Sequence, residues 1–110
     1  MIDLVLRCTQ DGGFSELLAH GHANFGTRGN DIVCAAVSVL ARTAESFLKN
    51  NVDVTVQAPE RGRFTLSVAE NHRQDNEQLR FLALFLTEGF IGLQRDYPEN
   101  LSFRQEIVTS

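Results

Sequence analysis

Apolar and polar residues alternate over several short stretches of the chain, and each stretch predicts a strand with one buried face. The first alternation leads into the dipeptide Asp11-Gly12, which favours a tight hairpin turn into the second stretch. A later pair of stretches is joined by the turn sequence APERG. The pattern predicts five strands, over about residues 2–8, 14–21, 52–56, 64–68 and 101–108.

Two longer segments carry apolar residues at helical spacing, and they predict helices over about 32–49 and 75–95. Asp75 offers a start signal for the second helix, and Pro98 follows its end. The predicted element order is therefore ββαββαβ. This order predicts an α+β fold, with two helices packed on one mixed or antiparallel sheet in a single domain over residues 1–110.

Composition limits the class of protein. The chain has 110 residues, 43% of them hydrophobic, which is enough to build one buried core. Its formal net charge of −4 argues against direct nucleic-acid binding, because proteins that bind nucleic acids present a basic face. The sequence shows no long apolar run and no signal peptide, so we expect no membrane insertion and a cytoplasmic location.

The two cysteines, Cys8 and Cys34, are expected to be free thiols in a cytosolic protein. Cys8 falls on the apolar side of the first strand, so we expect it in the core. Cys34 is predicted to lie on the polar side of the first helix, away from the stripe that faces the sheet. That stripe is predicted to contain Val33, Val37, Leu40, Ala44 and Phe47, and the side with Cys34 to contain Ser38, Ala41, Arg42, Glu45 and Lys49.

The position of Cys34 near a helix N-terminus suits a reactive thiol. Asp31 is the predicted N-cap, which puts Cys34 in the first turn. Unpaired N–H groups and the positive end of the helix dipole favour a thiolate at such a position. We expect the same N–H groups to receive the negative oxygen of a tetrahedral intermediate.

His22 is the predicted partner of Cys34. It follows the second strand, and the intervening loop contains Gly26, Gly29 and Asn30, which allow the chain to double back. A histidine within hydrogen-bond distance of a cysteine is the arrangement by which thiol hydrolases activate their nucleophile. We therefore predict a Cys–His catalytic pair.

Other interpretations of these residues stay open. Cys34 can be a small packing residue at a crowded helix start. A metal site would use His20, His22, Asp31 and Cys34, but the chain has no dedicated metal-binding spacing, and we expect no metal. Asp31 either only caps the helix or also orients His22. Ser38 either supports the site or bonds back to a carbonyl of its own helix.

The second helix is apolar nearly all round from residue 79 to 93, which is more than one sheet face requires. Its phenylalanines Phe81, Phe85 and Phe90 are predicted to be mostly core, and His72 ahead of it to be a solvated loop residue. We expect a homodimer to bury the surplus apolar surface.

The sequence from residue 21 to 38 resembles that of a known family. Gly-His-Ala is followed, after a glycine-containing loop, by GNDIVCAAVS. The ribosomal-processing cysteine protease family, Prp, has a similar pattern of Gly-His-Ala and then Gly-x-Asp-Ile-Val-Cys-Ala-Ala-x-Ser. The element order and the length are similar to the family as well. The matching positions include Gly21, His22, Ala23, Gly29, Asp31, Cys34 and Ser38.

The resemblance implies a bacterial cysteine endopeptidase that removes a short N-terminal extension from large-subunit ribosomal protein twenty-seven. It implies a cut after a segment with a pair of phenylalanines, a homodimer, and the roles of nucleophile for Cys34 and base for His22. We expect no cofactor. Two alternatives are an assembly factor that binds a ribosomal protein precursor without cutting it, and a metal-binding protein.

The loop that joins the second strand to the first helix is predicted to close over the bound extension. It contains two glycines and no aliphatic anchors, so we expect it to be mobile when the site is empty. The predicted substrate loop contains Ala23, Asn24, Phe25, Gly26, Thr27, Arg28, Gly29 and Asn30.

Overall fold

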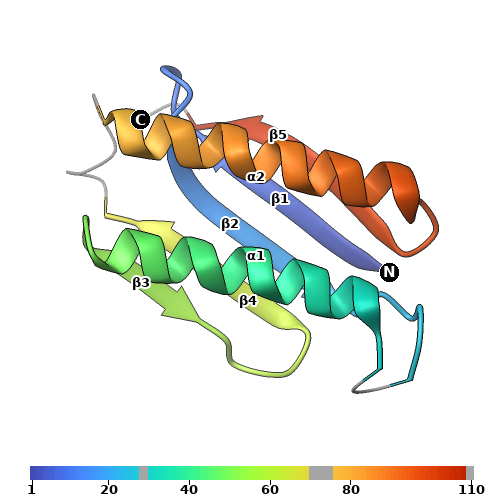
Figure 1. The fold of residues 1–110 in the computed structure, drawn as a ribbon. Helices are drawn as coiled ribbons and strands as arrows, with labels where there is room; N and C mark the ends of the chain where they lie inside the picture. Colours follow the sequence, from blue (N-terminus) through green and yellow to red (C-terminus); the bar gives the residue numbers. More distant parts are fainter. Residues whose placement is uncertain (28–29, 70–75, 109–110) are drawn as a thin grey trace.

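Two helices lie side by side on one face of a five-stranded sheet (Figure 1). The computed structural model describes residues 1–27, 30–69 and 76–108. Arg28, Gly29, His72 and Asp75 lie outside these residues, so the predictions for them have no structural outcome. The elements in chain order are β1 (Ile2–Cys8), β2 (Phe14–Gly21), α1 (Ile32–Lys49), β3 (Val54–Gln57), β4 (Arg63–Val68), α2 (Glu77–Asp96) and β5 (Leu101–Ile107).

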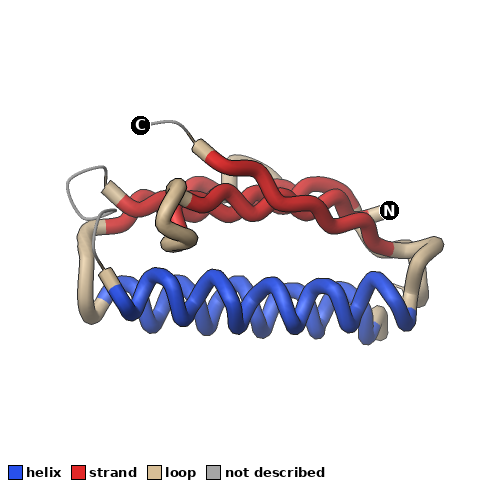
Figure 2. Tube along the Cα trace, turned by 90° about the horizontal axis from the view of Figure 1, so that it is seen from above, coloured by secondary structure: helices blue, strands red, loops and turns tan. Residues whose placement is uncertain are grey.

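The sheet is mixed, with strand order β3-β4-β2-β1-β5. The pairs β1–β2, β2–β4 and β3–β4 are antiparallel, whereas β1 and β5 are parallel. Figure 2 shows the helix layer below the sheet layer, and among the described residues no helix lies on the other face of the sheet. The predicted ββαββαβ order and the two-layer α+β fold are confirmed.

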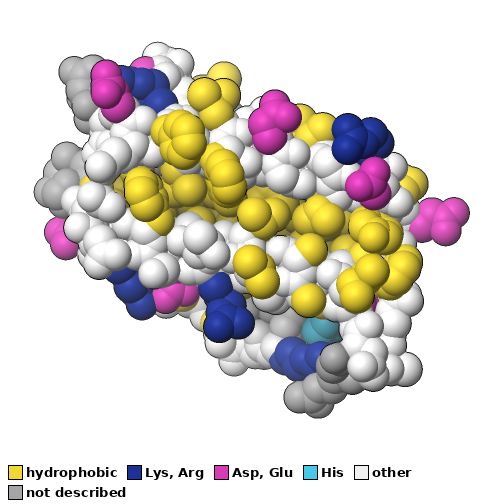
Figure 3. All heavy atoms as spheres, in the orientation of Figure 1, with side chains coloured by type: hydrophobic (Ala, Val, Ile, Leu, Met, Phe, Trp, Pro, Cys, Tyr) yellow, Lys and Arg dark blue, Asp and Glu magenta, His cyan; other side chains and the backbone are white. Residues whose placement is uncertain are grey.

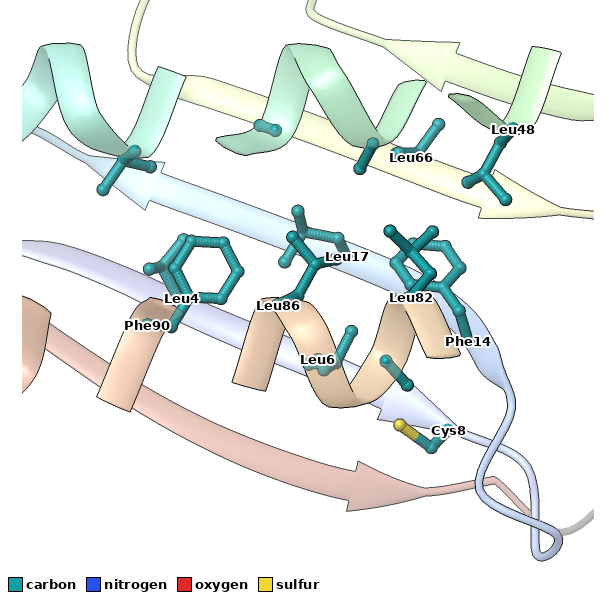
Figure 4. Close-up of a cluster of buried hydrophobic side chains, with 14 of the residues drawn as sticks. Leu4, Leu6, Cys8, Phe14, Leu17, Leu48, Leu66, Leu82, Leu86 and Phe90 are labelled. Carbon is teal, nitrogen blue, oxygen red and sulfur yellow. The ribbon is translucent and has the colours of Figure 1, made fainter. Parts of the chain in front are cut away.

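The core fills the space between the two layers (Figure 4). Cys8 is 7% exposed and belongs to this core, as its place in the alternating pattern predicts. Burial raises the pKa of its thiol, which keeps it in the neutral form. The largest fully buried side chains include Phe14, Phe90, Leu4, Leu6, Leu17, Leu48, Leu66 and Leu86.

The buried face of α1 differs from the predicted stripe. Leu40 and Phe47 were expected to face the sheet, but Leu40 lies against Gly89 of α2 and Phe47 is exposed. One member of the predicted stripe, Leu40, thus packs on the second helix instead of on the sheet. The buried face contains Val33, Val37, Ala41, Ala44 and Leu48. This face lies closer to Cys34 than the predicted stripe does. Cys34 is therefore half-buried and packs against the edge of the core, whereas it was predicted to lie on the polar side of the helix.

The prediction that the phenylalanines of α2 are mostly core is wrong for two of the three. Phe90 is fully buried, but Phe81 is 66% exposed and Phe85 is 53% exposed. The two exposed rings stack on each other with centroids 6.2 Å apart. Their positions lie on the outer side of α2, because its inner face is already filled by Leu79, Leu82, Ala83, Leu86 and Phe90.

Two predicted element starts shift by about two residues. The α2 helix begins at Glu77 after the N-cap Asn76, whose side chain accepts a hydrogen bond from the N–H of Leu79 at 3.1 Å. Strand β3 begins at Val54 rather than at Val52, since the N–H of Val52 donates to the carbonyl of Leu48 and completes the end of α1. In the described parts of the chain, no helix is long and apolar enough to cross a bilayer.

Candidate active site

The end of β2 directs His22 toward the turn between β3 and β4. Gly21 has φ +103, and a Cβ there would overlap the carbonyl oxygen of Met1, so only glycine fits. The N–H of Gly21 donates to the carbonyl of Gly62 at 2.7 Å. The exposed imidazole of His22 lies against the same glycine: a Cβ on Gly62 would be 2.7 Å from its Cε1 and Nε2.

Asp31 joins the start of α1 to the loop before it. As predicted, it is the N-cap, and its Oδ1 accepts hydrogen bonds of 3.0 Å from the N–H groups of Val33 and Cys34. Its Oδ2 accepts from the N–H groups of Phe25 at 2.9 Å and Gly26 at 3.2 Å. Among the described residues, every hydrogen bond to this carboxylate thus comes from the backbone and none from His22.

The pKa of Asp31 reflects this arrangement. Desolvation acts to raise it, but the hydrogen bonds from the N–H groups of Cys34, Gly26, Phe25 and Val33 outweigh desolvation and lower the pKa below its ordinary value. The carboxylate is therefore charged at neutral pH and stabilises the folded state there. This contribution is present above the unfolded-state pKa and is lost as the pH falls through the lower folded-state pKa.

We expect Asp31→Ala to lower both stability and activity. Loss of a helix cap costs about 1 kcal/mol, and here the loop also loses two hydrogen bonds. Asn76→Ala, which removes the cap of α2, is the matched control and should cost similar stability without loss of cleavage. Thermal melts measure stability and peptide cleavage measures activity. In melts at pH 7 and pH 3, the stability difference between Asp31→Ala and the wild type should be smaller at pH 3. Full activity in Asp31→Ala would contradict a role for this loop connection.

The hydrogen bonding of the N–H groups at the start of α1 differs from the prediction. They were predicted to be open to an oxyanion, but those of Val33 and Cys34 both donate to Asp31. The N–H of Ala35 donates to the Asp31 carbonyl, which is an ordinary helical hydrogen bond. The described N–H group that does point at the sulfur comes from the loop: Ala23 donates to Sγ of Cys34 at 3.5 Å.

The first half of the predicted substrate loop is anchored. The Phe25 ring packs edge-to-face on Tyr97, with centroids 5.1 Å apart. Ala23 is buried, and its carbonyl accepts a hydrogen bond of 2.9 Å from the side chain of Asn100. Asn30 bonds back to Thr27 through its N–H and its side chain. Residues 23–26 are therefore held by hydrogen bonds and an aromatic contact, which the lack of aliphatic side chains did not predict, and the expected mobility of the loop stays a prediction.

Two adjoining cavities meet at Cys34 and His22. The first, of about 360 Å³, lies between α1 and the β3–β4 turn, and its floor is apolar. The second, of about 350 Å³, extends toward the substrate loop and is lined by Asn24, Gly26 and Asp31. Both cavities are lined by His22, Cys34, Ser38 and Arg61.

Ser38 lies one turn beyond Cys34 and is exposed to both cavities. Its hydroxyl forms no hydrogen bond within the described part of the chain, so the alternative of bonding back to its own helix is not seen. The metal interpretation also gains no support, because no three His, Cys, Asp or Glu residues of 1–27, 30–69 and 76–108 are placed to hold an ion. The exposed His20 instead lies 3.5 Å from the guanidinium of Arg63.

Comparison with known proteins places the chain in a family. A family model described as cysteine protease Prp matches residues 1–102. The chain belongs to this family. It is 30% identical over 115 residues to the ribosomal processing cysteine protease Prp of Bacillus subtilis (strain 168), a match that covers 98% of this chain and 100% of the relative. As a Prp family member, it is a cysteine-type endopeptidase.

Solved structures show the same fold. The Prp protease of S. aureus with a covalently linked product peptide superposes with a TM-score of 0.83 at 18% identity, over 96% of this chain and 100% of the other. A Streptococcus mutans protein gives a TM-score of 0.81 at 24% identity, over 98% of this chain and 96% of the other. The agreement extends over nearly the whole chain, so the two-layer architecture is that of Prp structures.

Sequence reasoning missed three residues around the candidate site. Arg61 and Gly62 come from the β3–β4 turn, and Asn100 precedes β5. The turn itself was predicted, but its contact with His22 requires β4 to pair with β2, which local patterns do not specify. Asn100 is 77 residues from Ala23 in the sequence, and no local signal connects them.

We expect Gly62→Ala to impair catalysis through His22. Alanine at φ +82 is strained by about 1–2 kcal/mol, and its methyl group would displace the imidazole. Gly12→Ala is the matched control, because Gly12 has φ +90 but a Cβ there meets nothing within 4 Å. Cleavage kinetics should show at least about a tenfold loss for Gly62→Ala and normal kinetics for Gly12→Ala at equal folded concentration. Equal kinetics in the two variants would contradict the contact with His22.

Proposed function

We propose that this chain removes an N-terminal extension from large-subunit ribosomal protein twenty-seven, with Cys34 as nucleophile and His22 as general base. The observation that carries the proposal is that Cys34 and His22 line the same two cavities. The name of the B. subtilis relative, a ribosomal processing protease, supports a ribosomal substrate. The proposed site of action is the cytoplasm, where ribosomal proteins are processed.

Cys34 is favoured over Cys8 as the nucleophile. A cysteine protease needs an accessible thiol that forms a thiolate. Cys8 is buried, its pKa is raised by that burial, and the described residues that line the cavity beside it include no histidine. Cys34 is half-buried, lines the same two cavities as His22, and lies in the first turn of a helix whose positive dipole end favours a thiolate.

The proposed reaction has two halves. His22 takes the proton of Cys34, the thiolate attacks the scissile carbonyl, and His22 returns the proton to the leaving amine. Water then hydrolyses the acyl-enzyme and releases the cleaved N-terminal extension. Asp31 supports this reaction by fixing the start of α1 and the substrate loop, and Ser38 lies beside the path of the peptide.

The two cavities offer a route for an extended peptide past Cys34. The first cavity has an apolar floor that includes Ile2, Val37 and Phe64, which suits apolar side chains of the extension. The second is lined by the proposed substrate loop. The net charge of −4 favours association with a basic ribosomal protein.

We also propose that a second copy of this chain covers the outer face of the helices. Figure 3 shows hydrophobic side chains gathered along this face, over both helices. The exposed members of this apolar ridge include Ile32, Val39, Phe81, Leu84, Phe85 and Ile91. A contiguous apolar surface of this kind is rare on a monomer. Light scattering should give twice the chain mass of 12.3 kDa, and a monomer at micromolar concentration would contradict the dimer.

A synthetic peptide that spans the extension and the first residues of the mature ribosomal protein tests the proposed function. We expect the wild-type chain to cut it at one peptide bond, and mass spectrometry locates that bond. A peptide that binds but stays uncut would instead indicate an assembly factor. Scrambling the extension in a matched peptide controls for non-specific proteolysis.

A further inference from the structure

The backbone of Ala23 lies between Cys34 and Asn100, and both of its polar groups are engaged. Its N–H donates to Sγ of Cys34 at 3.5 Å, and its carbonyl accepts from Nδ2 of Asn100 at 2.9 Å. The geometry points to the Ala23 N–H as the donor that receives the oxyanion, and to Asn100 as the positioning residue that holds this N–H. The inference rests on the proposed function, since it requires Cys34 to be the nucleophile.

Attack by the sulfur moves negative charge onto the oxygen of the scissile carbonyl. The sulfur forms a bond to the carbonyl carbon, and the electron pair of the C=O π bond moves onto the oxygen. When the intermediate collapses, the C–N bond breaks, and the proton held by His22 goes to the amine. The oxyanion is bonded to the carbon that the sulfur has attacked, so a donor already aimed at the sulfur is close to the oxygen.

Two of the alternative donors at the helix start are already used. The N–H groups of Val33 and Cys34 each lie 3.0 Å from Oδ1 of Asp31. Within the described residues, the sulfur accepts no hydrogen bond other than the one from Ala23. Among the described N–H groups, the one of Ala23 therefore faces the reacting atom.

Asn100 is itself rigidly placed. Its N–H donates to the carbonyl of Tyr97 and its carbonyl accepts from the N–H of Ile2, both at 3.0 Å. Its side chain therefore reaches Ala23 from a turn that is fixed to α2 on one side and to β1 on the other. Ala23 is 1% exposed, so its carbonyl would lack a partner if the Asn100 amide were removed.

The other anchors of the loop do not replace this contact. Asp31 holds the N–H groups of Phe25 and Gly26, and Tyr97 packs on the Phe25 ring. The chain turns between Ala23 and these anchors, because Asn24 adopts a left-handed φ of 56. The Ala23 carbonyl belongs to the Ala23–Asn24 peptide and its N–H to the preceding one, so Asn100 acts on the N–H through the Ala23 Cα. Without Asn100, we expect the Ala23 backbone to shift and its N–H to leave the sulfur.

Asn100→Asp tests the inference, because the carboxylate has nearly the same shape but no N–H to donate. We expect kcat on the spanning peptide to fall about 10- to 100-fold, with KM changed by less than about twofold, because the oxyanion exists only after attack. Asn100→Gln keeps an amide donor and should recover part of kcat. Asn51→Asp is the matched control, since it removes a similar amide-to-carbonyl bond, to Phe47, at the far end of α1.

Amide hydrogen exchange of Ala23 gives a second measurement that needs no substrate. We expect this amide to exchange faster in Asn100→Asp, while amides in β1 and β2 keep their wild-type rates. If Asn100→Asp has the wild-type kcat, or the wild-type exchange rate at Ala23, the inference is overturned. The proposed function still holds in that case, provided that the wild-type chain cuts the peptide. A wild-type chain that leaves the peptide uncut contradicts the proposed function first and the oxyanion role with it.

Discussion

Cys34→Ala is expected to abolish cleavage and to leave the fold intact. The substitution removes the sulfur that attacks the peptide, and no general base can compensate for a missing nucleophile. The side chain is half-buried at the edge of the core, and its described hydrogen bond is the weak one from Ala23. Cys34→Ser should be nearly inactive as well, because a hydroxyl is far less acidic than a thiol. Peptide cleavage beside a thermal melt measures both effects.

Cys8→Ala provides the matched control, since it makes the same change at the other cysteine. Cys8 is buried in the core, so its truncation should lower the melting temperature. Cleavage per folded molecule should stay at the wild-type level, because Cys8 lies away from both cavities that contain His22. Residual cleavage by Cys34→Ala, or loss of cleavage only in Cys8→Ala, would contradict the assignment of the nucleophile.

His22→Ala is expected to lower kcat/KM by about 10²- to 10⁴-fold, the range typical for removal of a general acid–base. The imidazole is exposed and lies against Gly62, so its loss should cost little stability. Raising the concentration of an external imidazole should restore part of the rate, because a small base can enter the space that His22 leaves.

His20→Ala is the control for His22→Ala. His20 is exposed two residues earlier on β2, and its contact is with Arg63 rather than with Cys34. We expect its kinetics to equal those of wild type. Equal losses in the two histidine variants would indicate a general effect of the strand end on folding or binding, and would contradict His22 as the base.

A helix or strand of this fold is predictable from the sequence where its apolar residues fall on a single face. The α1 bounds follow from the pattern, because Asp31 caps one end and the apolar periodicity ceases at the other. The placement of Phe81 and Phe85 is not predictable in this way. Both fit an apolar helix, but whether they face the sheet depends on how α2 is rotated against β5, β2, β1 and α1.

The residues of the candidate site likewise differ in how far the sequence predicts them. Cys34, His22 and Asp31 lie close in the sequence, so the strand end, the loop and the helix start are enough to predict that they share a site. Gly62 and Asn100 reach it only through the strand order β3-β4-β2-β1-β5, which brings the β3–β4 turn and the start of β5 beside the end of β2. Asp31 was predicted as the N-cap, but the sequence did not show that this cap occupies two of the N–H groups that were also expected to receive the oxyanion.

The intact mass of the full-length ribosomal protein precursor, after incubation with this chain, tests whether the chain is a Cys34-dependent processing protease. We expect a single loss of mass at the N-terminus with the wild-type chain and an unchanged precursor with Cys34→Ala. A precursor that stays whole with both versions, or one that is shortened equally by both, would contradict a Cys34-dependent processing protease.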